Sequence, residues 1–184
     1  MSITSTQLQQ QYIAYFGRPG DPEGINYWTS DATDIKTAAD FAEKIYAQSE
    51  YQTTTIASKT TSEQVNQLYV NLFNRSADAA GLLYWTTEIE KGSLSLSNLA
   101  YDLIYATQNP LEDNGQQAAQ DAANLNAKVA AAEAYTTTVA SNAGALIAYQ
   151  PGAAYESAVS FISSVSFNTQ VNQPVITTAS GLAP

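Results

Sequence analysis

The sequence predicts an all-α protein made of two repeated three-helix units followed by Ala-rich helices. Three observations lead to this prediction. Apolar residues recur at intervals of three and four along most of the chain, one stretch of the sequence occurs twice, and the third quarter of the chain is rich in alanine, the strongest helix former. The alternation of apolar and polar residues that marks a β-strand plays no part in this pattern.

The repeated stretch is Gly17–Trp28, and its second copy is Asn74–Trp85. The copies are 57 residues apart (85 − 28 = 57) and share the pattern Arg-x-x-Asp-x-x-Gly-x-x-Tyr-Trp. The shared positions are Arg18 and Arg75, Asp21 and Asp78, Gly24 and Gly81, Tyr27 and Tyr84, and Trp28 and Trp85. Because self-similarity at a fixed offset marks a repeated structural unit, we expect helical units at about residues 6–50 and 62–108, within a tandem repeat covering residues 1–110.

Each unit is predicted to begin with a helix that ends at the repeated stretch. In the first unit this helix covers residues 6–16, with Ser5 or Thr6 as its N-cap. Gly17 follows its end, and Asn74 holds the same place in the second unit. Both residue types tolerate the left-handed backbone that commonly ends a helix, so we expect that conformation at both positions.

A second helix is predicted to follow the turn in each unit. Asp21 and Asp78 precede it as N-caps, and Pro22 stands at the first helical position of the first copy. Glycine is unfavourable inside a helix by about 1 kcal/mol relative to alanine. Gly24 and Gly81 therefore indicate that another part of the chain approaches the backbone closely.

The remaining residues of the motif have two interpretations. In the first, Arg18 and Arg75 lock the turn by bonding the Asp of their own loop or the last carbonyls of the preceding helix, while Trp28 and Trp85 fill the core. In the second, the Tyr-Trp pair is a platform for a sugar ring, and the Arg and Asp side chains bind its hydroxyls. The first interpretation is favoured, because the two Trp residues fall on the predicted core stripe.

A third helix closes each unit, and the residues beyond the repeat form a second region. Residues 111–166 are Ala-rich and predict helices over Gln116–Ala140 and Ala153–Val165. Residues 167–184 are dominated by Asn, Gln, Thr, Pro and Ser, and we expect them to be a flexible linker to a further C-terminal part.

Composition excludes several classes of function. The chain has neither Cys nor His, so Cys/His zinc sites and catalysis by a His base or Cys nucleophile are ruled out. Its net charge is −10, which disfavours nucleic-acid binding. The sequence predicts no transmembrane segment and no N-terminal signal peptide. Carboxylate pairs such as Glu88 and Glu90 diverge on a helix, so we expect a protein that is not an enzyme.

Two sets of residues are candidate binding sites. Calcium prefers several oxygen ligands from loops, and Asp21, Glu23, Asp31 and Asp34 lie in one loop-rich stretch. The favoured alternative is that these residues are helix caps and a solvated face. Exposed tyrosines suit binding to sugars or to neighbouring subunits, and the candidates are Tyr46, Tyr51, Tyr101 and Tyr105. The alternative is that these rings are half-buried on helix stripes.

The repeated motif resembles that of a bacterial domain family of unknown function, whose repeats read Leu-Gly-Arg-x-x-Asp-x-x-Gly-Leu-x-Tyr-Trp and end near Ser-x-Glu-Phe. The resemblance covers residue 8 to about residue 108. The first copy ends in the similar Ala47–Tyr51, whereas the second ends in Ala106–Asn109 and departs from the pattern. The family occurs in surface-layer (S-layer) and calcium-repeat (RTX-type) exoproteins, which resemble substrates of type I secretion.

This resemblance implies an extracellular module at the cell surface, exported without an N-terminal signal peptide. The expected function is that of an N-terminal anchoring module of a surface-layer protein, which binds lipopolysaccharide or another envelope glycan without catalysis, with Ca²⁺ as the cofactor to test. The alternative is a structural oligomerisation or spacer module of an RTX-type protein that contacts copies of itself. A glycan binder should have a polar cleft with exposed aromatic rings, and a spacer should have a large apolar patch.

Overall fold

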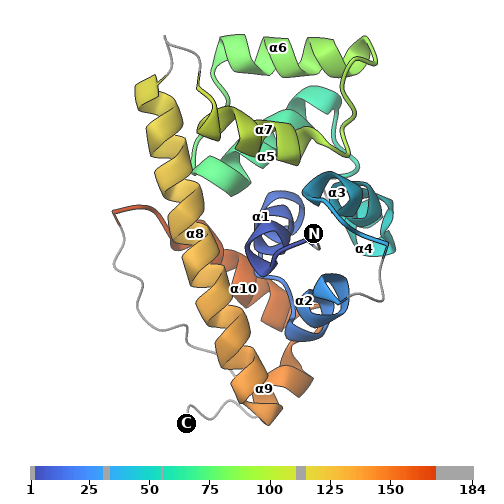
Figure 1. The fold of residues 1–184 in the computed structure, drawn as a ribbon, viewed down its shortest axis with the longest axis vertical. Coiled ribbons are helices and arrows are strands. Elements are labelled where there is room, and N and C mark those ends of the chain that lie inside the picture. The colour runs from blue at the N-terminus through green and yellow to red at the C-terminus, as the bar shows by residue number, and fades with distance from the viewer. Residues whose placement is uncertain (1–2, 31–33, 55, 111–114, 169–184) are drawn as a thin grey trace.

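The chain is all-α in the computed structural model, which describes residues 3–30, 34–54, 56–110 and 115–168 (Figure 1). Within these ranges it forms ten helices and no strand. The helices are α1 (Ser5–Phe16), α2 (Pro22–Thr29), α3 (Ala38–Ala47), α4 (Ser49–Gln52), α5 (Thr61–Phe73), α6 (Ala79–Glu90), α7 (Leu99–Gln108), α8 (Gly115–Ser141), α9 (Ala143–Ala148) and α10 (Ala153–Ser164). The predicted linker falls almost entirely on residues 169–184, outside the described ranges.

The two copies of the repeated stretch have the same local geometry. Gly17 and Asn74 follow α1 and α5 with φ angles of 65° and 60°, which confirms the predicted left-handed helix ends. The Asp21 carboxylate accepts a hydrogen bond from the backbone N–H of Gly24, and Asp78 does the same for Gly81. Both aspartates are therefore N-caps, as predicted, and Pro22 is the first residue of α2.

The predicted N-cap of the first helix is wrong. Thr4 caps α1, one residue before Ser5 and two before Thr6, the predicted caps. Its hydroxyl accepts from the backbone N–H of Gln7, and the Gln7 side chain accepts from the Thr4 backbone N–H in return. This reciprocal capping box satisfies two N–H groups at once, which neither alternative cap offers in the structure.

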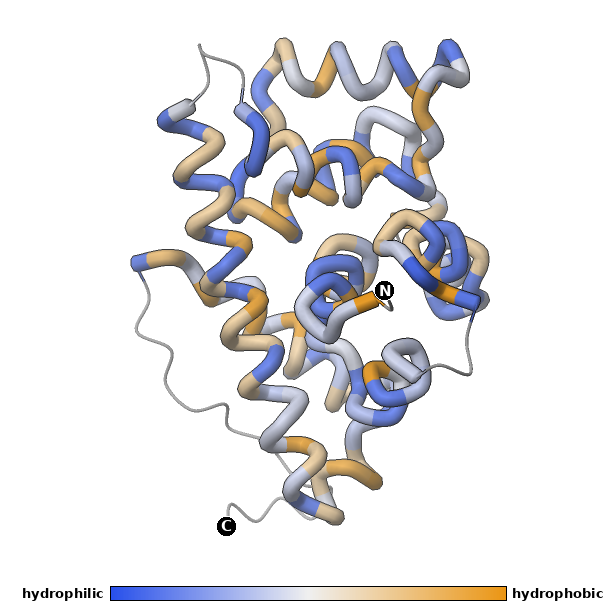
Figure 2. The backbone as a smooth tube through the Cα atoms, viewed as in Figure 1, coloured by the Kyte–Doolittle hydropathy of each residue, from blue (hydrophilic) through white to orange (hydrophobic). Residues whose placement is uncertain are grey.

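The central helix is α1, which packs against α2, α3, α5, α7 and α8. Helix α8 runs along the molecule from the end that carries α6 to the end that carries α9 (Figure 1). Hydrophobic and hydrophilic residues alternate in short blocks along α8, as expected for a helix with one buried stripe (Figure 2). One core cluster contains side chains from α1, α3, α5, α7, α8 and α10, so both copies of the repeat share a core with the C-terminal helices.

The C-terminal helices largely follow the prediction. Helices α8 and α10 begin and end within one residue of their predicted bounds, while α9 was not predicted. The first unit also contains a short fourth helix, α4, at its predicted end near residue 50, which the sequence did not predict. Trp28 and Trp85 are partly buried and pack against the core cluster. No helix in the described ranges is both long and apolar enough to cross a membrane.

Candidate functional site

A cleft of about 500 Å³ lies beside the second copy of the repeated motif. We call it the repeat-2 cleft. Residues of α5, α6, α7 and the first turns of α8 line it. Its walls combine aromatic rings with charged groups, among them Tyr69, Tyr84, Trp85, Arg75, Asp78 and Asp121. Ligand sites typically have a small number of convergent polar groups among aromatic and apolar side chains.

Arg75 is the central charged residue of the repeat-2 cleft. Its Nε and Nη2 atoms donate to the two carboxylate oxygens of Asp121 at 2.8 and 2.6 Å, a bidentate pair. Its Nη1 atom donates to the carbonyl of Ser76 and lies 3.7 Å from Asp78. The sequence predicted either the Asp of the same loop or the last carbonyls of the preceding helix as partner, but the main partner is Asp121 on α8, 46 residues away.

The aromatic side of the cleft depends on a contact between α5 and α6. The Trp85 indole N–H donates to the Tyr69 hydroxyl at 2.9 Å. A Cβ atom on Gly81 would lie 2.9 Å from the same hydroxyl oxygen, closer than real side chains come. The close approach predicted for Gly81 is therefore present, and it holds Trp85 against α5. Tyr84, next to it on α6, stays 55% exposed.

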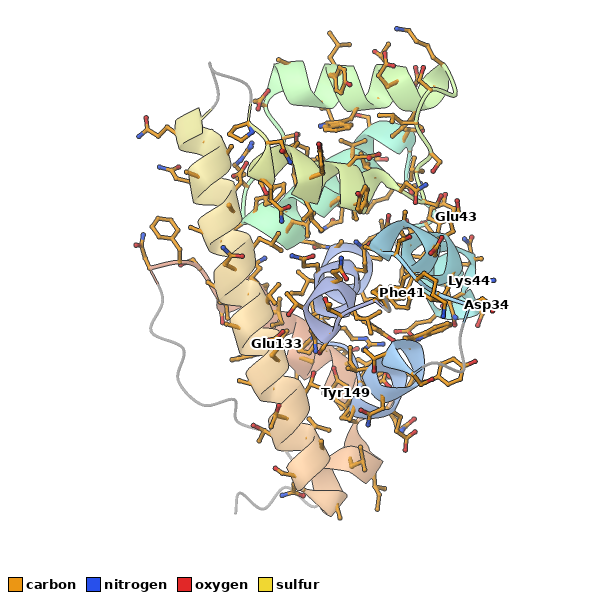
Figure 3. The ribbon with its side chains drawn as sticks, viewed as in Figure 1. Asp34, Phe41, Glu43, Lys44, Glu133 and Tyr149 are labelled. Carbon is orange, nitrogen blue, oxygen red and sulfur yellow. The ribbon has the colours of Figure 1, made fainter. Side chains whose placement is uncertain are left out.

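The equivalent place in the first copy is filled by the chain itself. Arg18 is only 2% exposed, and its Nη2 atom donates to Glu50 of α4 at 2.6 Å. The Tyr155 ring of α10 lies over the guanidinium, with its centroid 3.8 Å from Cζ. Tyr149 closes the same region, because its hydroxyl donates to the carbonyl of Pro19. Figure 3 shows Tyr149 within the molecule.

The two copies share several contacts of their arginines and differ in what lies beside them. In both, the Arg lies near a Tyr of the preceding helix, at 5.2 Å for Arg18 and Tyr12 and at 5.0 Å for Arg75 and Tyr69. In both, a carboxylate from another helix binds the guanidinium. These shared contacts give the motif a structural role, but each Arg is held mainly by a distant helix and not by the predicted Asp of its own loop or the last carbonyls of the preceding helix. The second copy has the open cleft in addition.

The tyrosines predicted to bind a glycan do not form one exposed surface. Tyr51 is buried, at 1% exposure, because its hydroxyl donates to Gln64 and its ring packs against Tyr46 in the core, so its prediction as an exposed platform is wrong. Tyr46 is half-buried. Tyr101 and Tyr105 are exposed and stack on each other along α7, with ring centroids 6.5 Å apart. None of the four lines the repeat-2 cleft.

The residues predicted to bind calcium are spread over a helix cap and the surface. Asp21 caps α2, and Glu23 is exposed in its first turn. Asp34 is exposed at the edge of the molecule, on the same side as Lys44 of α3 (Figure 3). Asp31 lies outside the described residues. In the ranges that the structure describes, no three acidic side chains gather as a metal site would require.

A buried lysine went unnoticed in the sequence. Lys128 of α8 is 1% exposed and donates to the carbonyls of Val70 and Asn71 in the last turns of α5. Burial lowers its pKa to about 8. A cation at the carboxyl end of a helix satisfies carbonyls that have no partner within the helix, so Lys128 joins α8 to α5. The sequence signal was a lysine within the apolar stripe that contains Leu125 and Val129.

Residues 42–109 match a known family. Its model is described as a domain of unknown function (DUF4214), and the family is bacterial. The DUF4214 region contains α4 to α7 and the last turns of α3, so it includes the second copy of the repeated stretch and three of the four helices that line the cleft. No curated protein and no solved structure matches the chain.

Proposed function

We propose that this chain is a non-catalytic binding module of a secreted surface-layer protein, which attaches the protein to lipopolysaccharide or another polysaccharide of the outer envelope. The repeat-2 cleft is the site that would hold the sugar. The observation that carries the proposal is the combination, in one open cleft, of the exposed Tyr84 ring and the Trp85 ring with the charged groups of Arg75, Asp78 and Asp121.

The chemistry of the cleft suits a sugar ring. A pyranose has apolar C–H faces, which pack on aromatic rings, and a rim of hydroxyls, which need hydrogen-bond partners. Tyr84 and Trp85 supply amphipathic rings. Asp78 has one carboxylate oxygen that caps α6 and a second that lies near Arg75, and both oxygens retain lone pairs for a hydroxyl donor.

The same contacts argue against catalysis. Glycoside hydrolysis needs one carboxyl group that donates a proton and a second carboxylate on the other side of the bond. Both oxygens of Asp121 accept hydrogen bonds from Arg75, and Asp78 accepts the N–H that begins α6. These contacts engage both carboxylates as hydrogen-bond acceptors within the fold. We therefore propose a site that binds without reacting.

The negative net charge of the chain is the reason to include calcium in this proposal. The chain carries 17 acidic and 7 basic residues, for a net charge of −10. An anionic part of the envelope would be repelled unless a divalent cation bridged the two. Calcium is therefore proposed as a bridging ion between the chain and anionic envelope groups, separate from the repeat-2 cleft.

A second candidate function rests on the exposed face of α6. No residue of this helix is buried, and Leu83 and Tyr84 are 69% and 55% exposed. An exposed apolar face can mark contact with another protein. In this alternative the chain is a spacer, in which α6 meets a copy of itself and the cleft has no ligand.

Cosedimentation with lipopolysaccharide from the producing bacterium tests the proposal, in calcium and in a chelator. We expect Tyr84→Ala to weaken binding about tenfold, or about 1.4 kcal/mol. Tyr27→Ala is the matched control, because Tyr27 holds the same motif position in the first copy and is 57% exposed. Absence of binding by the folded chain in both conditions, together with dimers that Leu83→Glu dissociates, would favour the spacer.

A further inference from the structure

We propose that the repeat-2 cleft selects an uncharged, hydroxylated six-membered ring, such as a neutral hexose of the envelope polysaccharide, and discriminates against anionic sugars. This inference rests on the proposed function and narrows its ligand class. Two independent observations carry it. One is the balance of charges within the cleft, and the other is the ring that fills the equivalent place in the first copy.

The charges in the cleft leave no cation for an anionic ligand. Arg75 is the one basic side chain that lines the cleft in the described residues, and Asp78 and Asp121 are its acidic ones. Asp121 takes two of the guanidinium N–H donors, and the carbonyl of Ser76 takes a third. One positive and two negative groups give a net charge of −1 (1 − 2). A uronate or phosphate in the cleft would meet two carboxylates and a neutralised arginine.

The first copy shows what kind of group fits on this arginine. There the Tyr155 ring, an uncharged six-membered ring with one hydroxyl, lies 3.8 Å from the Arg18 guanidinium carbon. Burial raises the pKa of the Tyr155 hydroxyl; Arg18 lowers it, while Asp21 and Glu50 raise it further. The ring therefore stays neutral, among acidic groups that correspond in place to those of the second copy.

The surroundings of the two arginines correspond closely. Each lies about 5 Å from a Tyr ring of the preceding helix, and each pairs with a carboxylate at 2.6 Å. Glu50 supplies that carboxylate in the first copy and Asp121 in the second. The first copy holds an extra ring from α10 on its guanidinium, and in the described residues the second copy has no counterpart of it.

Residues 1–184 have no further aromatic ring for this place. None of the residues outside the described ranges is Phe, Tyr or Trp, as their sequences show. All the aromatic side chains of the chain are thus placed, and of these only the Tyr69 ring lies over Arg75. We therefore assign a ring that fills the repeat-2 cleft, as Tyr155 fills the first copy, to a group outside residues 1–184, and the test below distinguishes a sugar from an aromatic side chain.

The test compares two fractions of one polysaccharide. The polysaccharide released from lipopolysaccharide is separated by anion exchange into a neutral and an acidic fraction, and each is titrated against the chain in a chelator while Trp85 fluorescence is followed in a Trp28→Phe background. We expect the acidic fraction to bind at least about tenfold more weakly. Asp78→Asn should bring the two affinities about threefold to tenfold closer, because one carboxylate is removed.

Asp78→Asn is chosen because asparagine caps a helix as well as aspartate does, so α6 should stay folded. Asp21→Asn makes the same change in the first copy, outside the cleft, and should leave both affinities unchanged. Circular dichroism confirms folding of each variant.

Each outcome bears on a different statement. Equal or tighter binding of the acidic fraction would overturn the selectivity inferred here and leave the glycan-binding function standing. Binding of neither fraction would overturn the proposed function as well. Occupation of the cleft by N-acetyltyrosinamide, without binding of either fraction, would assign it to an aromatic side chain of a partner protein and would also contradict the inference.

Discussion

Glu50→Gln tests whether the two arginines of the repeat have different energetic roles. Arg18 is 2% exposed. Among the described residues, Glu50 supplies the one carboxylate that pairs with it, and its Nε atom has no hydrogen-bond partner. Removing one partner of a fully buried ion pair costs about 3–5 kcal/mol, because the other charge is left uncompensated. Glu50 is 40% exposed, so solvent screens part of that loss, and we expect about 2 kcal/mol.

Asp121→Asn is the matched change in the second copy. Arg75 is 26% exposed and keeps Asp78 at 3.7 Å, so water and a second carboxylate compensate for the lost charge. We expect this variant to lose about 1 kcal/mol or less. The difference between the two variants isolates the burial of Arg18, because both substitutions retain an amide oxygen that can accept from the guanidinium.

Urea denaturation followed by circular dichroism at pH 7 measures both losses. For a domain of this size, 2 kcal/mol corresponds to a fall in Tm of roughly 4–8 °C. Equal losses for the two variants, or a larger loss for Asp121→Asn, would refute the reasoning, because burial of the arginine would then not decide the cost of removing its partner.

Three further predictions concern single positions. Burial lowers the pKa of Lys128 to about 8 from the ordinary lysine value of 10.5, so between pH 8 and 10.5 the unfolded chain binds this proton more tightly than the native chain does. The cost of burying the charged Lys128 is therefore fully present below pH 8, and it decreases above pH 8 as the native lysine loses its proton. The stability of the native chain, from urea titrations, should rise by about 1 kcal/mol from pH 7 to 9, and Lys128→Met should lose that rise. Gly24→Ala should cost about 2 kcal/mol in the same assay, because its Cβ would lie 2.8 Å from the buried Tyr12 hydroxyl, whereas Gly115→Ala meets no atom within 4 Å and should not destabilise the chain. Asn74→Ala should lower the free energy of unfolding by about 1 kcal/mol, because alanine is unfavourable at a φ of 60°, and Asn74→Gly should lower it less. Thermal denaturation of both variants measures the difference.

Local features of the fold were predictable because neighbouring residues determine them. A glycine or asparagine after an apolar helix and an aspartate before the next one specify a left-handed end and an N-cap, and both were found in each copy. Alanine content and spacing predicted the long helix α8 and the shorter α10. Thr4 was missed as a cap because Ser5 and Thr6 have the same chemistry, and only the reciprocal bond with Gln7 distinguishes them.

The candidate site could be predicted only in part. The motif indicated Arg75, Tyr84 and Trp85, but the favoured interpretation assigned it a purely structural role, and the proposed tyrosine surface included the buried Tyr51. The sequence did not identify Asp121 as a residue of the site, because it is one of several polar residues on a long Ala-rich helix. Its role depends on α8 passing beside α5, 46 residues from Arg75 in the chain.

The sequence by itself determined the all-α class, the helix ends and the two equivalent copies of the Arg-Asp-Gly-Tyr-Trp stretch, because these depend on residues within a few positions of one another. The tertiary structure alone decided that the copies differ. Helix α10 places Tyr155 on Arg18 and closes the first copy, while α8 gives Arg75 the carboxylate of Asp121 and leaves a cleft beside it. That difference arises from long-range packing around two copies that share the same five key residues, and no local pattern records it.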